Sequence, residues 1–151
     1  MSQSLAHILI HLVFSTKNRE PLIKVEIQEQ LYAYMVGILK QHQSSSLIVN
    51  GTGDHVHLLF SLSKNKTLSD IVREVKTGSS KWIKTQPGDF QNFQWQNGYG
   101  AFSVSESNVE IVKKYIANQK KHHQKLSFKD ELRQLYVKHG LRFDEEYLWV
   151  D

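Results

Sequence analysis

The segment from His55 to Leu62 alternates between two kinds of side chain, and this pattern restricts the fold more than any other feature of the sequence. Successive side chains of a β-strand point to opposite faces, so the alternation predicts a strand with two different faces. One face is apolar and suits a core, whereas the other presents two imidazoles side by side. A strand gains little from adjacent histidines unless they bind something, and a divalent metal ion is the ligand that we favour over a structural role. The apolar face carries Val56, Leu58, Phe60 and Leu62, and the other face carries His55, His57, Leu59 and Ser61.

A second alternating segment, residues 5–16, repeats this design near the N-terminus. His7 and His11 stand on one face among aliphatic residues, while the other face is apolar. Two such strands in one antiparallel sheet would leave a second, partly polar surface that suits a binding site. We expect His7 and His11 to be sheet-face residues near that site rather than metal ligands. The apolar face carries Ala6, Ile8, Ile10, Leu12 and Phe14.

Between these two strands the sequence predicts a helix and a further strand. Apolar residues recur at helical spacing from Leu22 to His42, and Pro21 suits the first turn of such a helix. Residues 47–51 predict a short strand that is followed by a tight connection. Strands 47–51 and 55–62 should therefore pair as a hairpin, which gives the histidine strand a neighbour.

The second half of the chain predicts another helix, a last strand and two further helices. Thr67 caps the first of these helices, with Asp70 near its positive end. Gly78 within it costs roughly 1 kcal/mol against alanine, so we expect a break or a close backbone approach there. The later elements are a strand over 101–105, a helix from Ser105 or Ser107 to about His123, a capped helix from Ser127 to His139, and closing residues 141–151 that dock on a neighbour.

The order β-α-β-β-α-β, followed by helices, is the ferredoxin-like or split βαβ plan of an α+β protein. We expect an antiparallel sheet with two helices on its apolar face and a later, C-terminal helix directed toward the histidine face. The chain has 151 residues, of which 40% are hydrophobic and 23% charged, so it suits a single domain over residues 1–151 with a substantial core.

Composition excludes several other classes of protein. The chain has no cysteine, which rules out disulfides and thiolate metal sites. No segment reaches the roughly 18 apolar residues of a membrane span, and the N-terminus lacks a signal-peptide pattern, so we expect a cytoplasmic protein without a membrane partner. The formal charge of +4 weakly favours an anionic partner such as nucleic acid.

A second set of reactive side chains lies on the helix expected before His123. Tyr115 and Gln119 are four residues apart and are therefore neighbours on one helix surface. A tyrosine oxygen can act as a nucleophile, and a glutamine carbonyl can bind a metal ion. The surrounding lysines would favour a phosphate backbone, and they are Lys113, Lys114, Lys120 and Lys121.

The sequence His55-Val56-His57, followed by Tyr115-Ile116-Ala117-Asn118-Gln119, resembles the single-tyrosine HUH transposases of bacterial insertion sequences. These include relatives associated with repetitive extragenic palindromes (REP). The aromatic segment from Phe93 to Ser105 and the closing Lys138-His139-Gly140 look like the pattern of the same family. The resemblance covers nearly the whole chain.

This resemblance implies a fold and a reaction. Members of the family have a ferredoxin-like sheet and work as homodimers, and in many of them the tyrosine helix of one subunit completes the site of the other. They cut single-stranded DNA next to imperfect hairpins. Attack by the tyrosine leaves a 5′-phosphotyrosine and a free 3′-hydroxyl. A second 3′-hydroxyl then resolves the link, so strands are rejoined without ATP or another nucleotide cofactor.

Carried onto this chain, the resemblance makes Tyr115 the nucleophile, with a metal ion held by His55, His57 and Gln119. A free tyrosine has a pKa of about 10, so it needs help to attack at neutral pH. A cation on the scissile phosphate withdraws charge and orients the attack. We expect Mg²⁺ because of its cellular abundance, with Mn²⁺ as at least an equal substitute, because imidazole suits Mn²⁺ or Zn²⁺ better than Mg²⁺.

Several other side chains are candidates for contact with DNA. Trp95 and Tyr99 are able to stack on unpaired bases, although core or dimer packing explains them equally well. We expect His122 and His123 to be solvated or close to DNA. Candidate phosphate contacts on two helix surfaces are Lys76, Ser80, Lys81, Lys84 and Lys114, with a plain solvated face as the alternative.

Two other functions compete with a DNA strand-transferase. A ferredoxin-like sheet can bind nucleic acid through aromatic residues without catalysis, which predicts binding without metal and no covalent product. A metal-dependent hydrolase would use His55 and His57 to activate water, and its cleavage would be indifferent to Tyr115→Phe. A relative domesticated by its host would have the same chemistry as a mobile transposase.

Overall fold

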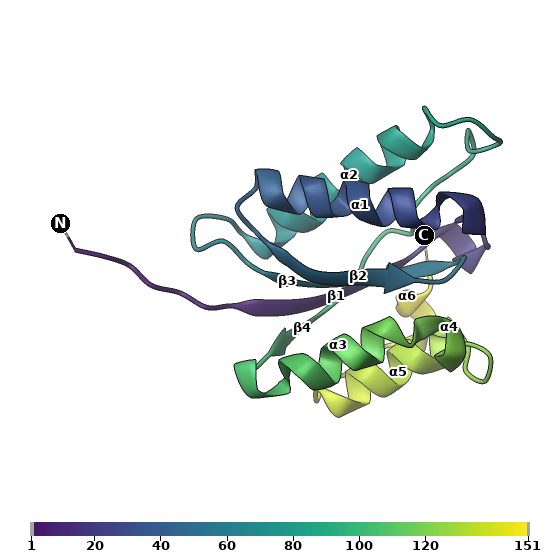
Figure 1. Cartoon of the computed structure of the whole chain (residues 1–151). Coiled ribbons are helices and arrows are strands. Elements are labelled where there is room, and N and C mark those ends of the chain that lie inside the picture. The colour runs from purple at the N-terminus through teal and green to yellow at the C-terminus, as the bar shows by residue number, and fades with distance from the viewer. Residues whose placement is uncertain (1, 151) are drawn as a thin grey trace.

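The structure, a computed structural model, describes residues 2–150 and contains one four-stranded antiparallel sheet between two layers of helices (Figure 1). The sheet order is β2-β3-β1-β4, as expected for the ferredoxin-like plan. Its strands are β1 (Leu9–Ser15), β2 (Ser46–Gly51), β3 (His55–Ser61) and β4 (Gly100–Val104). Its α-helices are α1 (Val25–Gln41), α2 (Leu68–Ile83), α3 (Val109–Ala117), α4 (Gln119–His122), α5 (Phe128–Lys138) and α6 (Glu145–Leu148).

The two alternating strands, β1 and β3, form the centre of the sheet and are antiparallel neighbours. Their pairing sets His57 opposite Val13 and His11 opposite Leu59. Side chains are buried on both faces of these strands because helices cover both sides of the sheet (Figure 1). The predicted α+β architecture is confirmed.

Helices α1 and α2 cover the apolar face, where the side chains predicted for the core lie together. Gly78 of α2 faces Ile38 of α1, and a Cβ at this glycine would lie only 2.8 Å from the Ile38 Cδ1 atom. The predicted close approach at Gly78 is therefore confirmed. The sheet contributes Leu12, Phe14, Val56, Leu58 and Phe60 to this core, and the helices contribute Leu31, Met35 and Val75 among others.

The predicted starts of β1 and α1 were wrong, and backbone hydrogen bonds explain the difference. β1 begins at Leu9 rather than residue 5, because β3 and β4 end opposite it at Ser61 and Val104. One further bond, from the Leu62 N–H to the Ile8 carbonyl (2.7 Å), extends the pairing, and Leu5 is 83% exposed. α1 begins at Val25, so Pro21 is not in its first turn. The backbone N–H of Ile23 donates to the Gly53 carbonyl (2.9 Å), which holds the segment before α1 against the β2–β3 hairpin.

The helix predicted to run to His123 is interrupted at Asn118. The Asn50 Nδ2 group on β2 donates to the Ile116 carbonyl (2.9 Å), and so takes up a backbone acceptor at the end of α3. The chain then continues as the short α4. This interruption matters because it redirects His123, as described below.

The other face of the sheet is covered by α3 and α5 (Figure 1). A second apolar cluster lies there beside the histidines, and the closing segment packs against it. This packing confirms the predicted docking for residues 141–150. Asp151 lies outside the described residues. None of the helices in residues 2–150 combines the length and the hydropathy that a membrane crossing demands. The cluster consists of Val13, Phe102, Phe128, Leu132, Leu135 and Tyr136, with Phe143, Leu148 and Trp149 against it.

Candidate active site

The histidine face of β3 is completely buried under α3, α4 and α5. His55 and His57 have no exposed surface, and their imidazole rings lie edge to face with centroids 5.2 Å apart. Burying two imidazoles costs free energy unless their nitrogen atoms find partners. The partners come from elements far away in the sequence.

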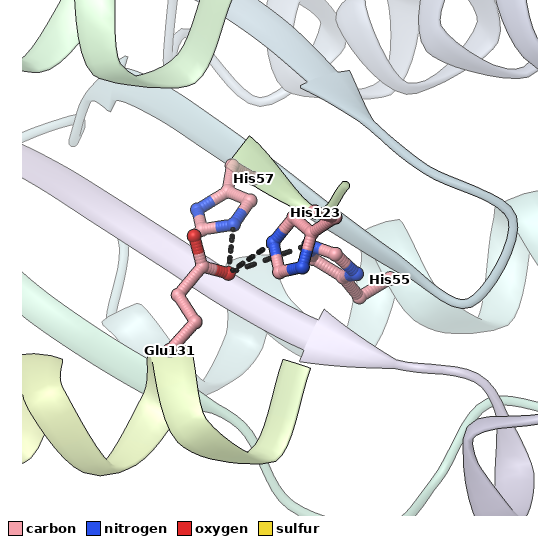
Figure 2. Close-up of side chains that lie close together, drawn as sticks. All are labelled: His55, His57, His123 and Glu131. Atoms are coloured by element: carbon pink, nitrogen blue, oxygen red, sulfur yellow. Dashed lines mark hydrogen bonds and ion pairs between the residues drawn. The ribbon is translucent and has the colours of Figure 1, made fainter. Parts of the chain in front are cut away.

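Glu131 of α5 is the centre of the cluster (Figure 2). Its Oε1 atom lies 3.0 Å from Nε2 of His57, 3.0 Å from Nε2 of His123 and 3.4 Å from Nε2 of His55. Ser127 starts α5 as predicted, since its Oγ accepts from the Asp130 backbone N–H (3.2 Å). The first turn of α5 is thereby fixed, and it points Glu131, which is 1% exposed, at the sheet.

Tyr115 and Gln119 reach the same carboxylate from α3 and α4. The Gln119 Oε1 atom lies 3.0 Å from Nε2 of His55, and its amide Nε2 donates to Glu131 Oε2 (3.1 Å). The Tyr115 hydroxyl donates a short hydrogen bond to the same Oε2 atom. The structure thus brings the four predicted residues, His55, His57, Tyr115 and Gln119, together within one chain.

The outer nitrogens of two histidines are held by acceptors. His55 Nδ1 donates to Asp54 Oδ1 (2.6 Å), and His123 Nδ1 donates to the Leu126 carbonyl (2.6 Å). When these rings are neutral, each therefore directs an Nε2 lone pair at the carboxylate oxygen. Lone pairs that converge in this way repel one another unless a proton or a cation lies between them.

The charges of the cluster follow from burial and from these contacts. Burial lowers the pKa of His55, but hydrogen bonds to Asp54 and Glu131 outweigh it and raise the pKa to about 9. Burial lowers the pKa of His57 to about 4, although Glu131 opposes this. Burial raises the pKa of the Glu131 carboxyl, but the hydrogen bonds from the histidines hold it well below its usual range.

The pKa of Tyr115 is raised above that of a free phenol, first by burial and then by the facing carboxylate of Glu131. The phenol is therefore protonated in the metal-free cluster. An added cation would favour the phenolate, because it would offset the carboxylate charge.

The donor set fits a divalent metal ion. One ligand atom from each of His55, His57, His123 and Glu131 lies within 4.8 Å of the others, and all four side chains are buried or nearly so. Three imidazole nitrogens and a carboxylate oxygen are ligands that Mn²⁺ or Zn²⁺ accept readily. Gln119 Oε1 adjoins this set through its contact with His55.

Sequence reasoning missed Glu131. The solvated position expected for His123 was wrong, because its ring is directed into the cluster, whereas the alternative of a position close to DNA stays a prediction. A signal for Glu131 was present, because it stands four residues before Leu135 and next to Leu132 on the predicted buried stripe of α5. An acidic residue on a buried helix face needs a partner. His123 carried no such signal, since its position depends on the interruption at Asn118.

The two histidines predicted for the first strand, His7 and His11, differ from each other. His11 lies under the site as expected, with its Nε2 atom 2.8 Å from Nδ1 of His57 and the two rings stacked. His7 precedes the strand, so the expectation of a sheet-face position was wrong. Its Nε2 atom lies 2.6 Å from Glu106 in an exposed pair.

The predicted DNA contacts lie on both sides of the sheet. Lys114 is exposed on α3 beside Tyr115, whereas Ser80 and Lys81 belong to α2 on the opposite face, and Lys84 directly follows that helix. Lys76 donates to the backbone carbonyls of Gln96 (2.6 Å) and Gly98 (2.9 Å). Phosphate contact by these residues stays a prediction. The structure does not bring the three residues of α2, or Lys84 after it, to the cluster.

The two aromatic candidates also differ. Trp95 packs edge-on against Phe14 and Phe93 and donates its Nε1–H to Ser79 Oγ (3.0 Å), which agrees with the packing alternative. Tyr99 is 40% exposed, so its surface remains accessible.

Comparison with known protein families gives a match over most of the chain. The family model described as "Transposase IS200 like" matches residues 4–119. The ISDra2 transposase TnpA of Deinococcus radiodurans is 25% identical over 114 residues, an alignment that covers 72% of this chain and 81% of the relative. The matched range includes Tyr115 and Gln119 but ends before His123 and Glu131.

Comparison with solved structures shows the same fold. A protein of Deinococcus radiodurans that is assigned as a transposase superposes with a TM-score of 0.61 at 23% identity, over 79% of this chain and 98% of that chain. A REP-associated tyrosine transposase bound to a REP hairpin gives a TM-score of 0.60 at 15% identity, over 95% of this chain and 89% of that chain.

Proposed function

Because the chain belongs to the family of IS200-like transposases, we propose that it cleaves and rejoins single-stranded DNA beside hairpin ends, with Tyr115 as the nucleophile. The family accounts for transposition as the general activity. The chemistry at Tyr115, the hairpin substrate and the metal ion are the parts that we propose for this chain.

The contact that supports this proposal most is the hydrogen bond between the Tyr115 hydroxyl and Glu131 Oε2. It places the phenol beside a carboxylate whose other oxygen touches His57 and His123. A nucleophile, an acceptor for its proton and a cluster of metal-binding donors therefore adjoin one another. Nucleophilic catalysis by a side chain of high pKa needs this combination.

In the proposed reaction, the Tyr115 oxygen attacks the scissile phosphorus and its proton passes to Glu131 Oε2. The bond between phosphorus and the 3′-oxygen breaks, and that oxygen leaves as a 3′-hydroxyl after taking a proton from water. The DNA is then joined to Tyr115 through its 5′-phosphate. In the rejoining step, the 3′-hydroxyl of a second strand attacks this phosphorus and gives its proton to water. The bond between phosphorus and the Tyr115 oxygen breaks, and Tyr115 recovers its proton from Glu131.

We propose that His55, His57, His123 and Glu131 hold the metal ion, with Gln119 able to join them. The ion would supply Lewis-acid stabilisation of charge on the scissile phosphate. Asp54 holds the His55 ring in place through Nδ1 and so directs Nε2 inward. Because three donors are imidazoles, we expect Mn²⁺ to bind more tightly than Mg²⁺.

The family resemblance also implies a homodimer, which we carry over as part of this proposal. Tyr115 contacts Glu131 of its own chain, so the arrangement described here is a cis arrangement. Light scattering of the protein with and without hairpin DNA would determine its molar mass. A constant monomer mass in both states would contradict the dimer.

The covalent intermediate gives the direct test. The protein is incubated with Mn²⁺ and labelled single-stranded hairpin DNA from the sequence flanking its gene, and the products are separated on a denaturing gel. We expect a protein–DNA adduct for the native protein and none for Tyr115→Phe. Tyr34→Phe is the matched control, because this exposed tyrosine lies on α1 across the sheet from the cluster, and it should leave the adduct intact.

Two results would contradict the proposal. An adduct that persists in Tyr115→Phe would exclude the nucleophile. Cleavage without an adduct, unchanged in Tyr115→Phe, would instead indicate a hydrolase that activates water at His55 and His57.

A further inference from the structure

A groove of about 530 Å³ runs along the surface between α3 and α5 and ends at the catalytic cluster. Tyr115 and Glu131 of the cluster line it, and so does the buried His11. A volume of this size lies within the range of sites that bind small organic molecules. Whatever occupies the groove lies directly against the nucleophile.

The walls of the groove have two kinds of surface. Ile111 and Val112 of α3 and Leu135 of α5 line the groove and give it an apolar section. Ile111 is 63% exposed, which is unusual for an isoleucine on an amphipathic helix and leaves apolar area for a ligand to cover. A flat nucleobase placed here would bury apolar area against these aliphatic side chains.

Polar groups stand along the rim. Among residues 2–150, the side-chain amides of Asn108 and Gln134 make no hydrogen bond to the protein, so their donors and acceptors are available to a ligand. Lys138 is exposed at the same rim and carries a positive charge. An apolar slot with amides beside it and a cation at its edge matches a base, its hydrogen-bonding edge and a phosphate.

A second cavity, of about 200 Å³, lies on the other side of α5 near Trp149. Tyr99 and Tyr136 line it together with Trp149, but neither Tyr115 nor Glu131 does. A nucleotide bound there would not adjoin the nucleophile. Because Tyr115 lines the groove between α3 and α5, this groove is favoured over the second cavity as the site of a nucleotide.

We propose that this groove binds the nucleotide on the 3′ side of the break, whose 5′-phosphate becomes attached to Tyr115. Its base lies against Ile111 and Leu135, and the amide of Gln134 reads the edge of the base. This inference rests on the proposed function, since it assigns a place to one nucleotide of the same substrate. It makes Gln134 a residue that determines sequence preference next to the cleavage site.

A 5′-mononucleotide is a direct mimic of that nucleotide and requires no knowledge of the hairpin. The ¹⁵N-labelled native protein is titrated with dAMP, dGMP, dCMP and dTMP in the presence of Mg²⁺, and amide chemical shifts are followed. We expect shifts at Ile111, Val112 and Gln134, and about tenfold tighter binding of one base than of the weakest.

Matched variants locate the contact. Gln134→Ala should reduce the difference between the four nucleotides to less than about threefold, whereas Gln30→Ala, an exposed glutamine on α1 across the sheet, should leave it unchanged. Shifts confined to residues outside the groove, or an unaltered preference in Gln134→Ala, would overturn the assignment. If the protein–DNA adduct forms normally but the titrations give either of these results, the proposed function is retained and only the assignment of the groove is rejected.

A second copy of the chain is the competing occupant, because exposed Ile111 is also suited to a dimer interface. Light scattering of Ile111→Asp distinguishes the two. Weaker nucleotide binding with an unchanged molar mass would support the nucleotide site. Conversion of a native dimer to a monomer, with nucleotide binding unchanged, would overturn it.

Discussion

The two faces of the sheet are both buried, yet they are built on opposite principles. The face under α1 and α2 consists of aliphatic and aromatic side chains, among them Leu58 and Phe60. The face under α3 and α5 buries three histidines of the sheet and the carboxylate of Glu131. Apolar burial stabilises by roughly 25 cal/mol per Å², whereas buried ionisable groups cost free energy that their contacts only partly return. The first face is an apolar core, whereas the second combines an apolar cluster with the buried ionisable side chains of the candidate site.

The two faces also differ in how far their components lie apart in sequence. Alternation within β1 and β3 defines the apolar face locally, and α1 and α2 complete it. The cluster joins His11, His57 and Glu131 from β1, β3 and α5, and its last members lie beyond the residues 4–119 that match the family. Substitutions on the two faces should therefore have separable effects.

The largest effect on stability is expected from the apolar face. Phe60→Ala removes a fully buried ring and should lower the free energy of unfolding by about 3–5 kcal/mol, measured by urea denaturation. Leu5→Ala, at an exposed position before β1, should change it by less than about 0.5 kcal/mol. A similar loss for both variants would mean that the apolar face is not the main source of stability.

Metal should stabilise the protein through the histidine face alone. Mn²⁺ at 100 times its Kd should raise the free energy of unfolding by about 2.7 kcal/mol, and a chelator should reverse the gain. His57→Ala should abolish the effect, which calorimetry and thermal unfolding would both detect. Stabilisation that persists in His57→Ala would place the metal elsewhere.

Replacing a residue that only orients a metal-binding histidine should reduce metal affinity less than replacing the histidine itself. Asp54→Asn weakens the contact that fixes the His55 ring, and we expect Mn²⁺ affinity to fall about 10–100-fold by calorimetric titration. Asp89→Asn, an exposed aspartate after α2, is the control and should leave the affinity unchanged. Equal affinities for both variants would show that Asp54 does not position His55.

The smallest changes in stability are expected from the loss of two helix caps. Thr67→Ala and Ser127→Ala each remove a side-chain cap, from α2 and α5 respectively, and each should cost about 1 kcal/mol of stability. Only Ser127→Ala should also weaken Mn²⁺ binding, because α5 carries Glu131. Weaker metal binding in Thr67→Ala would show that the two faces are coupled.

Much of the fold could be predicted from the sequence because its signals are local. A period of two residues defines β3, and cap residues such as Thr67 and Ser127 mark helix starts correctly. The errors arose where a distant partner decides the outcome. β1 starts late because its neighbours end, and the helix after Val109 breaks because Asn50 of β2 bonds to its last turn.

The same distinction between local signals and distant partners explains which residues of the candidate site could be predicted. His55, His57, Tyr115 and Gln119 form two short motifs, so the sequence and its resemblance to a family were enough to select them. Glu131 and His123 belong to no motif, and their contacts exist only after α5 folds over the sheet. An acidic residue on an apolar helix stripe signals that a partner is needed, but it does not identify that partner.

The central claim is that Tyr115 and the buried histidines share one metal-binding cluster. Crystals soaked in Mn²⁺, with data collected near the manganese edge, test it most directly. The account predicts one strong anomalous peak bonded to His55, His57 and Glu131, with the Tyr115 hydroxyl adjoining it. A protein that binds Mn²⁺ only elsewhere, or a cluster that stays without a peak at saturating Mn²⁺, would contradict it.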